Sequence, residues 1–142
     1  MLAAAISLTA CSAVVSVPDP APTGESEGVC TALMGDLPAT VLDGKRREVE
    51  PGRHSAAWGD PPITLRCGVD KPPELSAASA CYEVNGVGWF AEEASGGYLF
   101  TTIGRTAYVE VGVPSEYAPE ANALVDLAAT VNSHDPLVKP CL

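Results

Sequence analysis

Apolar and polar residues alternate in the middle of the chain in a pattern that predicts an antiparallel sheet. From Ile63 to Val69 every second side chain is apolar, which is typical of a half-buried strand. Three turn signals follow, and each supplies a residue that tolerates the positive φ of a tight hairpin: Asn85-Gly86, Gly96-Gly97 and Gly104-Arg105. They separate four expected strands, 80–84, 87–95, 98–103 and 106–113. The sequence therefore predicts a four-stranded meander that the strand at 63–69 joins.

Helical periodicity flanks these strands on both sides. The first apolar series at helical spacing is Cys30, Leu33, Met34, Leu37 and Val41, and Gly35 and Pro38 would shorten or kink that helix. A second helix is expected over 119–131, where Pro119 suits the first turn. Its apolar stripe is Leu124, Leu127, Ala128 and Val131. We therefore expect an α+β fold, an antiparallel four- to five-stranded meander sheet packed on one face by an N-terminal and a C-terminal helix.

The turn signals also predict a register. Two-residue turns pair Val84 with Val87, Ser95 with Tyr98, and Ile103 with Thr106. The expected core face is then Tyr82, Val84, Val87, Trp89, Ala91, Tyr98, Phe100, Ala107, Val109, Val111 and Val113. Glu93 falls on this face opposite Phe100, which indicates that the middle turn is longer or bulged. On the other face, the register places Glu92, Thr101 and Tyr108 side by side.

The N-terminus has the pattern of an export signal. Leu2 to Leu8 is apolar but far shorter than the roughly 20 residues of a membrane-spanning helix. Leu8-Thr9-Ala10-Cys11 then matches the lipobox of bacterial lipoproteins, in which the Cys thiol accepts a diacylglycerol. We expect a signal peptide over 1–11, a flexible tether rich in Pro, Ser and acidic residues over 12–28, and a single α+β domain over 29–142. The alternative is that Cys11 is a buried residue of an ordinary N-terminal helix.

Four cysteines remain after Cys11, and an even number in an exported chain favours two disulfides. Three pairings are possible, and the sequence alone does not select one. We favour Cys67–Cys81, which closes a short loop, together with Cys30–Cys141, which joins the two ends of the domain. The spacings fit no common zinc motif, so we expect no metal site.

The charge balance excludes some partners. Eight basic and 18 acidic residues give a net charge of −10. Nucleic-acid binding requires a clustered Lys/Arg surface, and the one basic cluster, Lys45-Arg46-Arg47, is followed by Glu48 and Glu50. We therefore expect no nucleic-acid partner.

The segment Trp58-Gly59-Asp60-Pro61-Pro62 is the most unusual local feature. As a rigid loop it would present Trp58 to a sugar or peptide, with Asp60 and Arg66 nearby. The alternative, which we favour, is a turn whose Trp fills the edge of the core. This segment and the row on the other sheet face together supply the candidate binding residues, which are Trp58, Asp60, Arg66, Glu92, Thr101 and Tyr108.

Catalytic signatures are weak. The chain has no nucleophile elbow and no phosphate-binding loop opening a helix. Glu92 and Glu110 could share a sheet face and act as an acid–base pair, but exposed sheets commonly carry glutamates for solubility. We expect no catalytic residues and no cofactor.

Three strings resemble a known family, and the likeness covers roughly residues 30–131. They are A-W-G-D-P-P-I-T-L-R-C-G-V from Ala57, C-Y-E-V-N-G-V-G-W from Cys81 and F-T-T-I-G-R from Phe100. With the lipobox, they resemble the actinobacterial lipoproteins of the domain-of-unknown-function family 3515. The resemblance implies a membrane-anchored envelope protein and carries no catalytic residues.

We therefore expect an extracytoplasmic lipoprotein on the outer face of the cytoplasmic membrane, attached by a diacylglycerol on Cys11. Its expected role is a binding or accessory module for a cell-envelope protein or glycan. The alternatives are an envelope hydrolase or transferase of unfamiliar type and a structural, chaperone-like protein.

Overall fold

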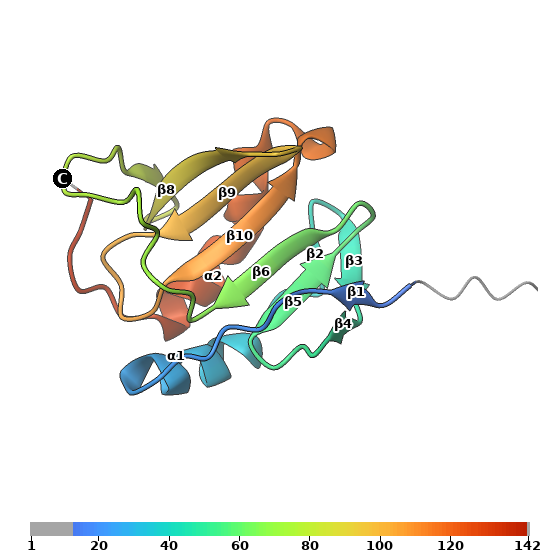
Figure 1. Ribbon diagram of the computed structural model, residues 1–142, viewed down its shortest axis with the longest axis horizontal. Coiled ribbons are helices and arrows are strands. Elements are labelled where there is room, and N and C mark those ends of the chain that lie inside the picture. Colours follow the sequence, from blue (N-terminus) through green and yellow to red (C-terminus); the bar gives the residue numbers. More distant parts are fainter. Residues whose placement is uncertain (1–12, 142) are drawn as a thin grey trace, which may run out of the picture.

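The computed structural model describes residues 13–141, in which two α-helices and ten strands follow one another along the chain (Figure 1). The helices are α1 (Glu25–Met34) and α2 (Ala123–His134). The first strands are β1 (Val15–Ser16), β2 (Thr40–Val41), β3 (Gly44–Arg47), β4 (Val49–Glu50) and β5 (Ser55–Trp58). The others are β6 (Ile63–Cys67), β7 (Tyr82–Val84), β8 (Val87–Ala94), β9 (Gly97–Thr102) and β10 (Val109–Pro114). Two short 3-10 helices, Ser115–Tyr117 and Glu120–Asn122, lead into α2.

Eight of these strands form one antiparallel sheet, in the order β2-β3-β5-β6-β10-β9-β8-β7. The α+β class and the meander β7-β8-β9-β10 with β6 alongside are confirmed. The predicted count of four to five strands is wrong, because β5, β3 and β2 extend the sheet beyond β6. These three strands have only two to four residues each, too few to show a periodic pattern.

The helices begin and end differently from the predicted ranges. The first starts at Glu25, five residues before Cys30, and ends at Met34, with Gly35 as its C-cap and Pro38 beyond it. Both helices contribute to one core with the sheet, through buried Cys30 and Leu33 of α1 and the apolar stripe of α2. No helix in residues 13–141 is long and apolar enough to cross a membrane.

The register agrees with the prediction in the first hairpin and differs in the next two. Val84 lies opposite Val87 as expected. In the second hairpin Tyr98 faces Glu93 instead of Ser95, and in the third Thr101 faces Glu110 instead of Tyr108. Each displacement is two residues, and because side chains alternate with period two, the assignment of faces is unchanged.

The predicted core face is therefore buried for most of its members: Val87, Trp89, Phe100, Ala107, Val109, Val111 and Val113. Val84, Ala91 and Tyr98 are half-buried, and Tyr82 is exposed over 58% of its surface. It belongs to the three-residue strand at the end of the sheet, where no further element covers it.

The disulfides join Cys30 to Cys67 and Cys81 to Cys141, so the favoured pairing is wrong. Cys67 ends β6 on the core face, where α1 packs and presents Cys30. Cys81 instead precedes β7 and meets the C-terminal segment, next to Gly88. One bond thus links α1 to β6 of the sheet, and the other links the C-terminal segment to the residue before β7.

The N-terminal segment, Ala13 to Thr23, packs along the domain. Val15 N–H donates to Glu48 O over 2.9 Å, where β1 pairs in parallel with β4, and Val17 is buried. Pro22 packs on Gly68, where a Cβ would overlap the proline ring.

Asp19 attaches this segment to the sheet. Its carboxylate accepts hydrogen bonds from the backbone N–H groups of Arg53 and His54 and from Ser55 Oγ. Burial alone would raise the pKa of Asp19, but these hydrogen bonds, from Ser55 first, outweigh it and lower the pKa. The expectation of a flexible tether over 12–28 is thereby corrected from Ala13 onward, since local composition does not show that distant backbone groups bind this segment.

Candidate binding cleft

Arg66 and Glu110 form an ion pair on the sheet face opposite the core. Arg66 Nε donates to Glu110 Oε1 over 2.9 Å, and the two side chains are 29% and 17% exposed. The register puts Glu110 between Arg66 and Thr101, on adjacent strands. A half-buried ion pair fixes both side chains and leaves their remaining polar atoms at the surface.

An open cleft of about 620 Å³ lies over this pair. Its floor is the sheet, with Arg66, Glu110, Glu92 and Leu99. Its walls are the loop that follows β6 and the N-terminal segment. The wall residues are Pro20, Ala21, Gly68, Val69, Asp70, Lys71, Pro72 and Pro73. The cleft therefore combines three carboxylates, two cations and a small apolar surface, which suits a polar ligand.

Two of the predicted binding residues, Arg66 and Glu92, line this cleft together. Thr101 lies between Glu110 and Phe90 in the register but is buried, and its Oγ1 has no hydrogen-bond partner in the described part of the chain. Tyr108 lines a smaller neighbouring pocket of about 140 Å³. The predicted row of Glu92, Thr101 and Tyr108 is wrong because the two-residue displacement puts Glu110 beside Thr101.

Trp58 does not present its ring to a ligand. Its side chain is fully buried, and Nε1 donates to Pro38 O over 2.9 Å. The Arg46 guanidinium lies 5.4 Å from the ring centroid. The favoured alternative, a Trp that fills the edge of the core, is confirmed. Asp60 is exposed and lies 3.9 Å from Arg47 Nη1, so it does not join Arg66.

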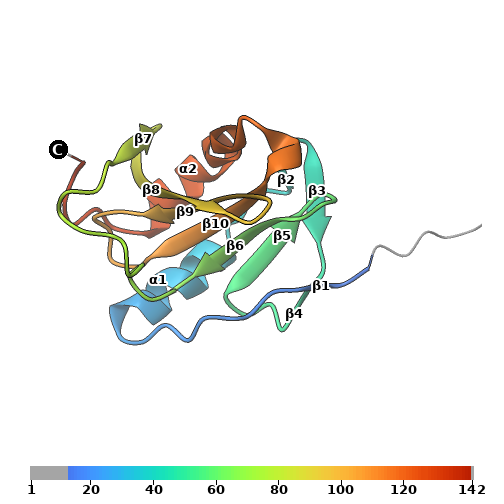
Figure 2. The same ribbon diagram turned by 45° about the horizontal axis from the view of Figure 1, so that its top comes forward.

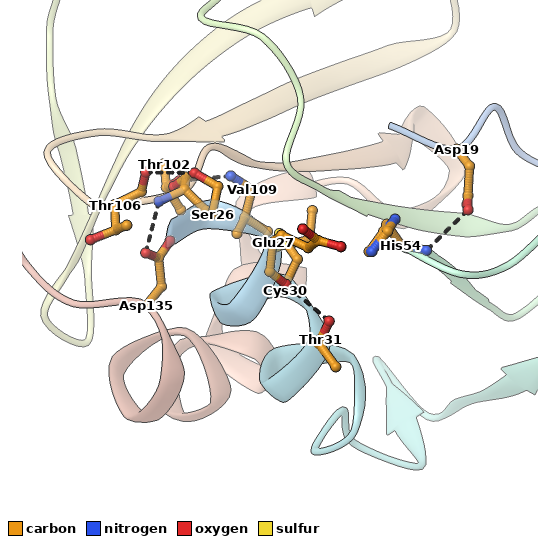
Figure 3. The surroundings of a disulfide bond; sticks show 12 residues. Asp19, Ser26, Glu27, Cys30, Thr31, His54, Thr102, Thr106, Val109 and Asp135 are labelled. Atoms are coloured by element: carbon orange, nitrogen blue, oxygen red, sulfur yellow. Dashed lines mark hydrogen bonds between the residues drawn. A yellow bond between two sulfur atoms is a disulfide. The ribbon is translucent and has the colours of Figure 1, made fainter. Parts of the chain in front are cut away.

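Within residues 13–141, Asp135 is the one carboxyl whose pKa burial shifts strongly, and sequence reasoning missed it. Desolvation raises its pKa to about 6, against the hydrogen bond from Ala107 N–H and the charge of Arg105. Figure 3 places it near Thr106, whose carbonyl accepts a hydrogen bond from Ser26 of α1. Asp135 follows α2 and does not line the cleft. It binds the backbone N–H of Ala107 and is not part of the candidate site.

The other half of the cleft was also missed from the sequence. Asp70, Lys71 and the prolines after β6 read as an ordinary loop, and Pro20 and Ala21 read as part of a tether. The pairing of Arg66 with Glu110 follows from the contact between β6 and β10, which no local pattern specifies. Within residues 13–141, no group of three His, Cys, Asp or Glu side chains is placed to hold a metal ion.

Comparison with known proteins adds a family and no activity. No curated protein and no solved structure matches the chain. The model of one family, described as a protein of unknown function (DUF3515), matches residues 1–139. The chain therefore belongs to the DUF3515 family.

Proposed function

We propose that the protein is a lipid-anchored binding module of the cell envelope and that the cleft over Arg66 and Glu110 holds its ligand. The observation that supports the proposal is that four separate segments of the chain meet at this cleft. Segments around residues 20, 70, 92 and 110 converge on one ion pair that stays partly open to solvent.

The ligand should carry a positive group and several hydroxyl or amide groups. Glu92 and Asp70 can accept hydrogen bonds from it, Arg66 can donate, and Leu99 supplies a small apolar contact. Amino sugars of a cell-wall glycan or a polar segment of an envelope protein offer this combination. The two disulfides agree with an extracytoplasmic domain.

The anchor is Cys11, which lies outside the described residues. One residue separates Cys11 from Ala13, whose carbonyl accepts a hydrogen bond from Arg47 Nη2. Two peptide units span at most about 7 Å, so a lipid on Cys11 would hold the domain directly against the bilayer. Cys11→Ala should release the protein into the medium or leave it unprocessed, as cell fractionation would measure. Unchanged fractionation of this variant would refute the anchor.

In-cell photocrosslinking tests the cleft. A photoreactive residue in place of exposed Lys71 should crosslink to one envelope component, whereas the same residue at Val125, exposed on α2, should not. Adding Arg66→Gln or Glu92→Gln should reduce the Lys71 crosslink several-fold in a protein that stays folded and anchored. Equal crosslinking from both positions, or no effect of either glutamine, would refute a specific ligand in the cleft.

A second candidate, an envelope hydrolase or transferase, rests on the presence of Glu92 and Glu110 in the same cleft. Glu110 already accepts from Arg66, which favours its use in binding over proton transfer. Incubation of the folded protein with purified cell wall, followed by product analysis, separates the two. Turnover that Glu92→Gln abolishes would replace the binding proposal with this one.

A further inference from the structure

One edge of the sheet is only partly covered. β8 spans Val87–Ala94 and pairs with β9 from Trp89 to Ala94. On its other side, β7 pairs with residues 87–89 alone. No strand in the described part of the chain pairs with residues 90–94 on that side, and Figure 2 shows β7 as the short last strand at this edge.

Two residues of this open stretch present free backbone groups. Gly88 O accepts from Ile103 N–H over 2.9 Å, so the even-numbered residues of β8 bond to β9. In an antiparallel ladder the bonding direction alternates. Ala91 and Glu93 therefore aim their N–H and C=O groups away from the sheet, ready to pair with another strand.

An apolar groove of about 470 Å³ runs beside this open edge. It lies between the sheet and the start of α2, with Tyr82, Ala91, Phe100 and Leu124 among its lining residues. The rings of Tyr98 and Phe100 stack at 5.8 Å and form part of its floor. A strand added to β8 would place alternate side chains over this groove.

The rim of the groove is acidic. Glu83 and Glu120 line it, and the lining residues, all within the described part of the chain, include no Lys or Arg. Glu93 accepts a hydrogen bond from Tyr98 Oη over 3.3 Å. The negative charge of Glu93, and to a smaller degree that of Glu120, raises the pKa of Tyr98. Both carboxylates therefore contribute negative potential at the groove, which Tyr98 lines.

We propose that the open edge of β8 and this groove bind an extended, cationic segment of a partner protein by strand addition. The segment would pair with Ala91 and Glu93, put an apolar side chain into the groove opposite Ala91, and put a Lys or Arg opposite Glu93 two residues away. A second copy of this chain is disfavoured as the occupant, because joining two such edges would bring their glutamates together. The inference goes beyond the proposed function, since the groove shares no lining residue with the cleft.

Blocked peptides test the proposal on the folded, disulfide-bonded protein. The probe is a nine-residue threonine peptide with one lysine and, two residues later, one leucine, because a strand that runs antiparallel to β8, as β7 does, meets Glu93 before Ala91. Its matched control carries glutamate in place of the lysine. NMR should show binding of the lysine peptide, with slowed hydrogen exchange at the amides of Ala91 and Glu93. The lysine peptide should bind about tenfold more tightly than the glutamate peptide. The reason is that the interaction energies of an attractive and a repulsive cross-strand charge pair differ enough to change a dissociation constant about tenfold.

Two charge-reversal variants provide the control within the protein. Glu93→Lys should reverse the preference between the peptides, whereas Glu27→Lys on α1, an equal change in net charge on an exposed helix, should leave it unchanged. Tyr82→Ala should weaken binding of the lysine peptide about fivefold by opening the groove.

Other results would overturn the inference. They are no binding at millimolar peptide, equal binding of the two peptides, or a preference that Glu93→Lys leaves unchanged. A concentration-dependent dimer that protects the Ala91 amide without peptide would assign the edge to a second copy. If the probe at position 71 forms no crosslink in cells while the purified protein still binds the lysine peptide, the cleft proposal is refuted and the strand-addition proposal is not.

Discussion

Replacing Asp135 by asparagine should change how the stability of the fold depends on pH. Asp135 is fully buried; its Oδ1 accepts from Ala107 N–H over 3.0 Å, and its Oδ2 has no hydrogen-bond partner in the described part of the chain. Arg105 Nη1 donates to the backbone carbonyl of Asp135 instead of its carboxylate. The charged form therefore lies in a poorly compensated site, and its pKa rises from 3.8 to about 6.

The direction of the effect follows from proton linkage. Between pH 3.8 and about 6 the folded state holds the Asp135 proton more tightly than the unfolded chain. The contribution of this group to stability is therefore highest at low pH and decreases as the pH rises through that window. Since a pKa change of one corresponds to about 1.36 kcal/mol, the ionised carboxylate costs about 3 kcal/mol at pH 7.

Asparagine keeps an acceptor for Ala107 N–H and does not ionise. The free energy of unfolding of Asp135→Asn minus that of the wild type should therefore rise by about 3 kcal/mol between pH 3 and pH 7. Urea unfolding at several pH values with both disulfides oxidised measures it, and an unchanged m-value supports the comparison. Asp70→Asn, which removes an exposed carboxylate, reports the effect of net charge alone. A difference that stays within about 0.5 kcal/mol, or that falls with pH, would refute the reasoning.

Three further variants test the packing of the domain. Trp58→Phe should lower the free energy of unfolding by about 2 kcal/mol, because Pro38 O loses its buried donor; an unchanged urea midpoint would contradict this. The double substitution Cys81→Ser with Cys141→Ser should cost about 4 kcal/mol in the same assay, since it opens a cross-link of 60 residues, and a loss below about 1 kcal/mol would refute it. Asp19→Asn weakens three hydrogen bonds and should speed limited proteolysis between residues 13 and 24 several-fold without changing the global unfolding midpoint by more than a few degrees.

Local patterns predicted the part of the fold that local physics determines. Alternation and turn residues located four neighbouring strands, and the core face was right because both register differences are two residues. The exact register depends on which glycine takes a positive φ. Gly96, at φ 81°, allows a turn through Ser95 and Gly96, one residue earlier than the Gly96-Gly97 signal suggested.

The third hairpin was wrong for a different reason. Hydrogen bonds to distant residues fix the segment that connects β9 to β10. Its Arg105 donates to Gly86 O, to Asn132 Oδ1 and to Asp135 O. These partners are 19 to 30 residues away in the sequence, so the turn cannot be deduced from its own residues. The same holds for Trp58, whose partner is a carbonyl 20 residues earlier.

The candidate cleft shows where sequence reasoning stops. The chemistry of Arg66, Glu92 and Glu110 was visible, since charged side chains alternate with apolar ones along these strands. Their convergence depends on β6 lying beside β10 and on Asp19 holding the N-terminal wall in place. Each is a contact over more than 35 residues, selected by the packing of the whole sheet.

The order of the strands relates the open edge of β8 to the proposed anchor. Arg47 of β3 binds the carbonyl of Ala13, so the chain leaves the domain beside one end of the sheet, near β1 in Figure 1. β8 is five strands away from β3, and neighbouring strands are about 4.8 Å apart, which puts the open edge roughly 24 Å from that point. With a lipid on Cys11, the β8 edge would therefore lie away from the attachment point, where a strand donor could approach it from the rest of the envelope.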